Sequence, residues 1–158
     1  MLLPTIVMAA CAIPLALGPE RRCSRAWGAL ALPVAAMAAG AVIATPGAYL
    51  CGGVLALLSA PIAVAGAPRG AGLAGLHRAI AALLTAWCLF SGAAGHTPAA
   101  NGPAHHMVTP LGPLLAGLYG LIAVIAVAHH WRRREGRFAA CGEVAGMSAG
   151  VAIMLLPA

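Results

Sequence analysis

Residues 138–157 read FAACGEVAGMSAGVAIMLLP, and this stretch decides the class of fold. As a helix it is long enough to cross about 30 Å of hydrocarbon, at about 1.5 Å per residue. It carries one carboxylate within the apolar run. At about 100° per residue, spacings of four, three and four place a set of side chains on one face, namely Glu143, Met147, Gly150 and Met154. The stretch is therefore predicted to span a membrane inside a bundle, with Glu143 turned away from lipid.

A second stripe of the same stretch consists of glycines spaced by four, Gly142, Gly146 and Gly150. Glycines at this spacing let the backbone of a neighbouring helix approach closely, which is a common basis of helix association in lipid. The stripe is predicted to pack against another helix, either in this chain or in a partner or second copy.

The composition of the whole chain indicates an integral membrane protein. Hydrophobic residues make up 62% of it and charged residues 8%, whereas soluble domains have about 45–50% and about 25%. Its 158 residues provide for about six spans and for no separate soluble domain. The predicted fold is all-α, a single polytopic bundle of transmembrane helices over residues 1–158.

The predicted spans are separated by short polar or Pro- and Gly-containing connections. They cover about residues 2–18, 26–45, 48–67, 73–95, 111–130 and 138–157. The first span differs from a signal peptide because its positive charges follow the apolar run instead of preceding it, so a retained helix is expected, kinked by Pro14. Pro46 and Gly47 are predicted to form the turn between the second and third spans.

The nine basic residues, all arginines, predict the topology. They fall after the first, third and fifth spans or just inside the fourth, and none follows the second or fourth span. The positive-inside rule then places both termini outside the cytoplasm. Abundant Ala, Gly and Arg suggest a high-GC bacterial genome, so the expected location is a bacterial inner (cell) membrane.

Two charged residues lie within predicted spans. Arg78 is about five residues into the fourth span and Glu143 about five into the sixth, so each is roughly 7 to 8 Å deep from the cytoplasmic side. A lone charge at the bilayer centre costs about 2.5–3.5 kcal/mol on insertion scales, and an ion pair would offset much of that cost. Two interpretations remain open: a structural pair, or a proton or cation relay that includes the adjacent His77.

A second polar layer lies on the outer side. The connection 96–110 contains His96, His105, His106 and Met107, and the predicted topology brings Met154 near the same side. Imidazole and thioether together suit copper, so these five residues form a candidate copper site. Haem is an alternative, with His96 and one of the two adjacent histidines as axial ligands.

Other chemistries find no support in the sequence. The cysteines are scattered over different segments, which argues against a disulfide framework. No serine has the context of a catalytic nucleophile, and no glycine loop suited to phosphate precedes a helix, so no enzymatic activity is expected. The arginine clusters lie directly against the membrane, where anionic lipid is a nearer partner than nucleic acid.

The His-His-Met sequence at 105–107, followed by Met147 and Met154 in a last helix that ends in Leu-Leu-Pro, resembles a group of small actinobacterial multi-pass membrane proteins. Members of that group carry His and Met in an outer loop and Met again in the last helix. Their last helix commonly has a His about one turn before its first Met, where this chain has Glu143. A carboxylate is a harder ligand than imidazole, so this departure weakens the case for a soft metal. The resemblance implies a membrane location and no particular activity.

The sequence leads to two hypotheses about function. The first is an accessory or structural membrane protein that packs against a membrane protein partner or a second copy, with copper handling at its outer face. The alternative is a small transporter or proton-coupled carrier that uses His77, Arg78 and Glu143.

Overall fold

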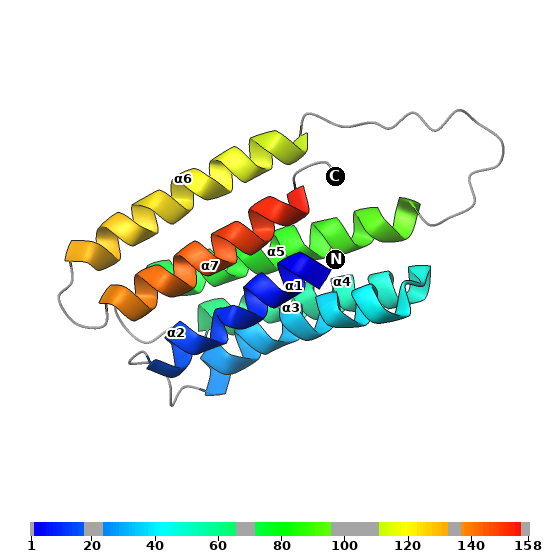
Figure 1. Ribbon diagram of the computed structural model, residues 1–158, viewed down its shortest axis with the longest axis horizontal. Coiled ribbons are helices and arrows are strands. Elements are labelled where there is room, and N and C mark those ends of the chain that lie inside the picture. The colour runs from blue at the N-terminus through cyan, green and yellow to red at the C-terminus, as the bar shows by residue number, and fades with distance from the viewer. Residues whose placement is uncertain (1, 18–23, 66–71, 96–110, 133–136, 156–158) are drawn as a thin grey trace.

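The computed structural model describes residues 2–17, 24–65, 72–95, 111–132 and 137–155. Within these ranges the chain is all-α and contains no strand, which confirms the predicted fold class. The helices are α1 (Leu2–Ala10), α2 (Ala12–Leu17), α3 (Ser24–Ile43), α4 (Pro46–Ala65), α5 (Gly72–Gly95), α6 (Leu111–Arg132) and α7 (Arg137–Leu155). They lie along a common direction as an elongated bundle (Figure 1).

Five of the described helices, α3 to α7, are long and apolar enough to cross a membrane. Their bounds agree with the last five predicted spans to within a few residues. The composition and these helices together identify an integral membrane protein. The first turn of α1 and the last turn of α7 lie toward the same end of the bundle (Figure 1).

The first predicted span is divided into the two short helices α1 and α2. The helix is interrupted at Cys11, whose backbone N–H donates to the carbonyl of Met8 in a tighter turn. Pro14 has no N–H to offer the carbonyl of Ala10, so the regular ladder loses a bond one turn before the proline. The predicted kink is therefore present as a break, three residues before Pro14.

The turn between α3 and α4 lies two residues earlier than the sequence predicts. Ala44 adopts a left-handed conformation with φ 48°, and its N–H donates to the carbonyl of Gly40, which is a common way to end a helix. Thr45 Oγ1 then accepts from the N–H of Ala48 at 3.3 Å and caps α4. Pro46 becomes the first residue of α4 because its missing N–H is not needed there.

Helix α5 is the centre of the bundle. It contacts α3, α4, α6 and α7, and half of its membrane-spanning residues are buried, whereas only 17% of those in α6 are. Small residues bring its neighbours close. A Cβ placed on Gly53 of α4 would lie 2.5 Å from the ring of Phe90 on α5, so this crossing requires glycine.

Helix α7 packs against α5, α6 and the α1–α2 segment. The break at Cys11 faces α7 at Gly146, where an added Cβ would lie 2.7 Å from the Cys11 sulfur. Around this contact is the largest group of buried apolar side chains, which includes Met8, Met37 and Met147. The first segment is thus held to the last helix by a core of sulfur-containing and small residues.

Candidate functional site

An ion pair between α5 and α7 lies inside the bundle. Arg78 Nε donates to Glu143 Oε1 at 2.5 Å, and Arg78 Nη2 donates to Glu143 Oε2 at 2.8 Å. Arg78 is 4% exposed and Glu143 is 7% exposed. This bidentate arrangement uses the planar fork of the guanidinium and is among the strongest charge-assisted contacts that a protein makes. The structure therefore joins the two residues that the sequence places at equal depth.

His77 lies beside the ion pair and is almost completely buried. Its Nε2 lies 3.4 Å from Ser148 Oγ on α7, and Ser148 Oγ donates to the carbonyl of Val144 at 2.7 Å. Because the hydroxyl proton of Ser148 is used in that bond, the tautomer that suits this contact carries its proton on Nε2 of His77. The histidine is thus oriented by α7 as well as by its own helix.

The ring of His77 also stacks on Tyr119 of α6, with ring centroids 5.0 Å apart and an interplanar angle of 22°. Tyr119 is 2% exposed. Its hydroxyl lies near Ser148 but has no hydrogen-bond partner within the described part of the chain. A buried hydroxyl without a partner carries a free-energy cost and could bind a small polar group.

The polar core, defined here as His77, Arg78, Tyr119, Glu143 and Ser148, therefore joins three helices. The sequence indicates three of these residues, His77, Arg78 and Glu143, but not Tyr119 or Ser148. A signal for Tyr119 exists, because it is a polar aromatic residue far from either end of an apolar span, where interfacial anchoring does not explain it. Ser148 gives no comparable signal, since serine bonds to its own helix backbone in many apolar helices.

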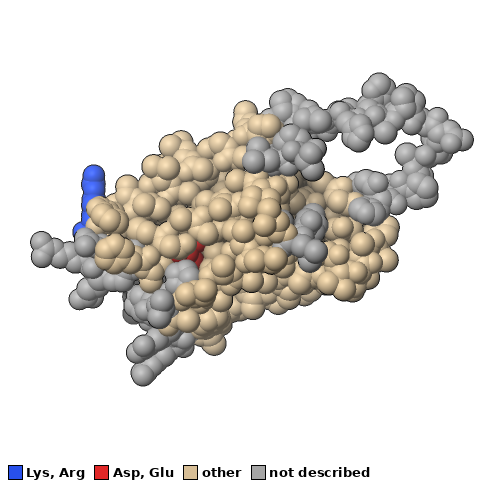
Figure 2. Space-filling model, viewed as in Figure 1, with Lys and Arg blue, Asp and Glu red and all other residues tan. Residues whose placement is uncertain are grey.

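The surface around the polar core carries little charge. The face shown in Figure 2 is almost uninterrupted by charge and has one small acidic area. Glu143 is the only acidic residue in the ranges that the structure describes, and its side chain is 10% exposed. The carboxylate is therefore nearly covered, and its charge is balanced by Arg78.

The predicted copper site falls mostly outside the described residues. His96, His105, His106 and Met107 all lie in the range 96–110. Met154 lies in α7, where it is half-buried and packs against the core around Met8 and Met147. In the part of the chain that is described, no group of three or more His, Cys, Asp or Glu residues is close enough to hold a metal ion.

The three glycines of the α7 stripe differ in how closely they are packed. Gly150 is buried, Gly146 is half-buried against Cys11, and Gly142 is exposed. The α1–α2 segment accounts for the close approach at Gly146, so this part of the stripe serves contacts within the chain. Gly142 remains on the outer surface of the bundle.

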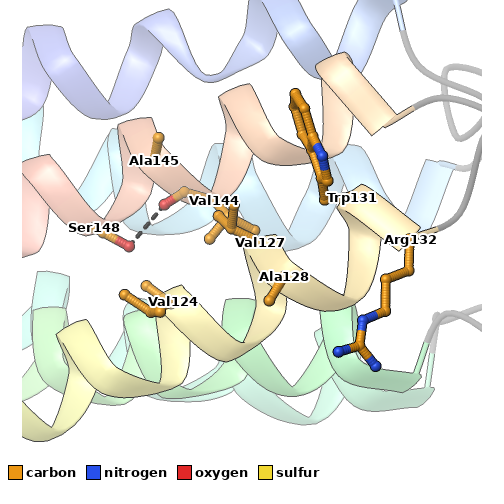
Figure 3. A pocket seen from close by; sticks show the side chains of 9 residues that line it. Val124, Val127, Ala128, Trp131, Arg132, Val144, Ala145 and Ser148 are labelled. Atoms are coloured by element: carbon orange, nitrogen blue, oxygen red, sulfur yellow. Dashed lines mark hydrogen bonds between the residues drawn. The ribbon is translucent and has the colours of Figure 1, made fainter.

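A groove on the outside of the bundle separates α6 from α7 and has a volume of about 470 Å³. Figure 3 shows Trp131 and Arg132 at one end of it and Ser148 toward the other. Ser148 is thus shared between this groove and the polar core.

Comparisons of the chain with protein-family models, with curated proteins and with solved structures find no match.

Proposed function

We propose that this chain is an accessory or structural protein of a bacterial inner membrane, without enzymatic activity, that packs against a membrane protein partner or a second copy. The observation that carries the proposal is the closed pair between Arg78 and Glu143. One guanidinium engages both oxygens of the carboxylate, and both side chains are buried. A carboxylate held in this way is suited to joining two helices.

The energetics of the pair support a structural role. A carrier that binds and releases a proton at Glu143 has to open the pair in every cycle. Removing one partner of a buried pair typically costs about 3 to 5 kcal/mol, because the other charge is left uncompensated. An accessory protein keeps the pair closed at all times and never meets this cost.

The partner surface proposed here is the exposed side of α6. This helix contacts only α5 and α7 among the described helices. Its exposed large side chains follow a helical spacing and include Leu114, Leu118, Leu121 and Ile125. In a bilayer such a surface contacts either lipid or another membrane protein, and helix packing in lipid does not require polar groups.

The experiment that tests this function is affinity purification of the tagged chain from its native membrane in a mild detergent. The expected result is a stable complex with another membrane protein, or a dimer, at a constant ratio. Glu143→Gln should lower the abundance of the chain and disrupt the complex. A chain that always purifies as a monomer, with no constant partner, would contradict the proposal.

A second candidate function is a small proton-coupled carrier, and the unpartnered Tyr119 hydroxyl next to His77 favours it. Such a hydroxyl, with the imidazole and Ser148, is chemically able to pass a proton toward Glu143. Proton uptake into liposomes that contain the purified chain and a pH-sensitive dye tests this candidate. If Glu143→Gln preserves abundance but abolishes uptake, the carrier replaces the accessory protein as the proposal.

A further inference from the structure

We infer that the groove between α6 and α7 is a binding site for one acyl chain of an anionic phospholipid, whose headgroup phosphate lies against Arg132. The wall of the groove is built from small and β-branched apolar side chains. They are Ala123, Val124, Val127 and Ala128 of α6 with Val144 and Ala145 of α7. Such a surface is suited to hydrocarbon and offers a polar ligand almost nothing to bond.

The length of the groove matches one leaflet of a bilayer. Ala123 and Arg132, the first and last lining residues of α6, are nine positions apart, which is about 14 Å along a helix. Half of a hydrocarbon core of about 30 Å is about 15 Å. An acyl chain that starts at the membrane surface near Arg132 can therefore lie along the whole groove.

The polar end of the groove has the chemistry of a headgroup site. Arg132 is exposed at the last residue of α6, and residues 131–137 contain four arginines and one glutamate. Glu143, the only carboxylate in the described ranges, is bonded to Arg78 and does not neutralise Arg132. Basic residues at this position next to a spanning helix attract anionic lipid.

Trp131 fixes the level of the membrane surface at the same end. Its indole packs edge to face against Phe138 of α7, with ring centroids 6.0 Å apart and an interplanar angle of 85°. Tryptophan is favoured where hydrocarbon meets headgroups. The aromatic pair thus lies beside the arginine at the depth where the phosphate and the first carbons of a phospholipid meet.

Native mass spectrometry of the full chain tests the site directly. The purified protein is equilibrated in detergent with equal amounts of phosphatidylglycerol and phosphatidylcholine, and the lipid that remains bound is counted. We expect one retained lipid per chain with a preference for phosphatidylglycerol. Arg132→Gln should reduce this preference about fivefold, the effect of one basic residue near a membrane surface.

Filling the groove separates the acyl-chain contact from the charge. Ala128→Phe should abolish retention of both lipids, and Ala145→Phe, on the opposite wall, provides the same test if the first variant fails to fold. The matched controls are Ala35→Phe, on the exposed side of α3, and Arg25→Gln, near the start of the same helix. Both should leave lipid retention unchanged.

Three results would overturn the inference. Undiminished retention in both groove-filling variants would place the lipid elsewhere. If Arg25→Gln weakens the preference for phosphatidylglycerol as much as Arg132→Gln does, general surface charge would explain the preference. A dimer that dissociates in Ala128→Phe would assign the groove to a second copy of the chain. None of these results depends on whether a partner protein co-purifies.

Discussion

Arg78 on α5 and Glu143 on α7, 65 positions apart in sequence, meet inside the bundle through hydrogen bonds of 2.5 and 2.8 Å. The contact joins the central helix, α5, to the last helix, α7. Both helices begin at the same end of the bundle (Figure 1). Each charge alone would be costly in an apolar environment, and each offsets the cost of the other. The pair therefore specifies which faces of α5 and α7 are inside.

Gly146→Ala is expected to destabilise the chain by about 1 to 3 kcal/mol, the usual cost of overpacking, because the new methyl group would lie 2.7 Å from the Cys11 sulfur. Denaturant titration in mixed micelles, followed by circular dichroism, measures the change. Combining it with Cys11→Ala, which removes that sulfur, should recover much of the loss.

Gly142→Ala is the matched control for the glycine stripe. Gly142 is exposed on the same helix, and alanine is favoured over glycine in a helix interior by about 0.5–1 kcal/mol. The expected result is a small gain in stability. An equal loss in both variants would mean that the contact between Gly146 and Cys11 is not the cause.

Tyr119→Phe and Ser148→Ala should change stability in opposite directions. The phenylalanine variant removes a buried hydroxyl without a partner and is expected to gain about 1 kcal/mol, whereas the alanine variant leaves Nε2 of His77 unpaired and should lose about 1 to 2 kcal/mol. The same unfolding titration compares them. A marked loss in Tyr119→Phe would show that the hydroxyl has a partner that stabilises the fold.

Ala44→Gly is expected to stabilise the turn between α3 and α4. A left-handed conformation costs a residue with a Cβ about 1–2 kcal/mol, a cost that glycine avoids, and the φ of Ala44 is 48°. The neighbouring Thr45→Ala should have the opposite effect, because Thr45 caps α4. An unchanged midpoint of the unfolding titration in both variants would contradict this description of the turn.

Copper handling at the outer face remains a prediction of the sequence. Elemental analysis of the purified protein after incubation with copper is the direct measurement. The combined variant His105→Ala, His106→Ala and Met107→Leu should lose bound copper if these residues are ligands. The hypothesis would be contradicted if the unmodified chain binds no copper, or if the combined variant binds as much copper as the unmodified chain.

The sequence predicts well where the helices lie along the chain, and it predicts less well which helices pack against one another. Long apolar runs mark α3 to α7, because hydrophobic length is a direct signal in a membrane protein. The pair of Arg78 and Glu143 could be anticipated because two charges at the same depth have few other ways to lower their cost. These inferences need only the distance of each residue from a helix end.

The contacts of Tyr119 and the central place of α5 could not be predicted in this way. In lipid both sides of a helix are apolar, so hydrophobic periodicity does not indicate which side of α6 faces the core. The glycines of α7 likewise indicate close packing but not the neighbour. The neighbour at Gly146 is the broken first segment, which reaches α7 at Cys11.

The measurement that tests the structural role of the polar core most directly is a double-mutant cycle on Arg78 and Glu143, with methionine at each position, by unfolding titration in mixed micelles. Each single variant should lose about 3 to 5 kcal/mol, and the double variant, with no charge left in the core, should be close to the unmodified chain. Single variants as stable as the unmodified chain would show that the pair does not hold α5 to α7, and the proposed structural function would lose its main support.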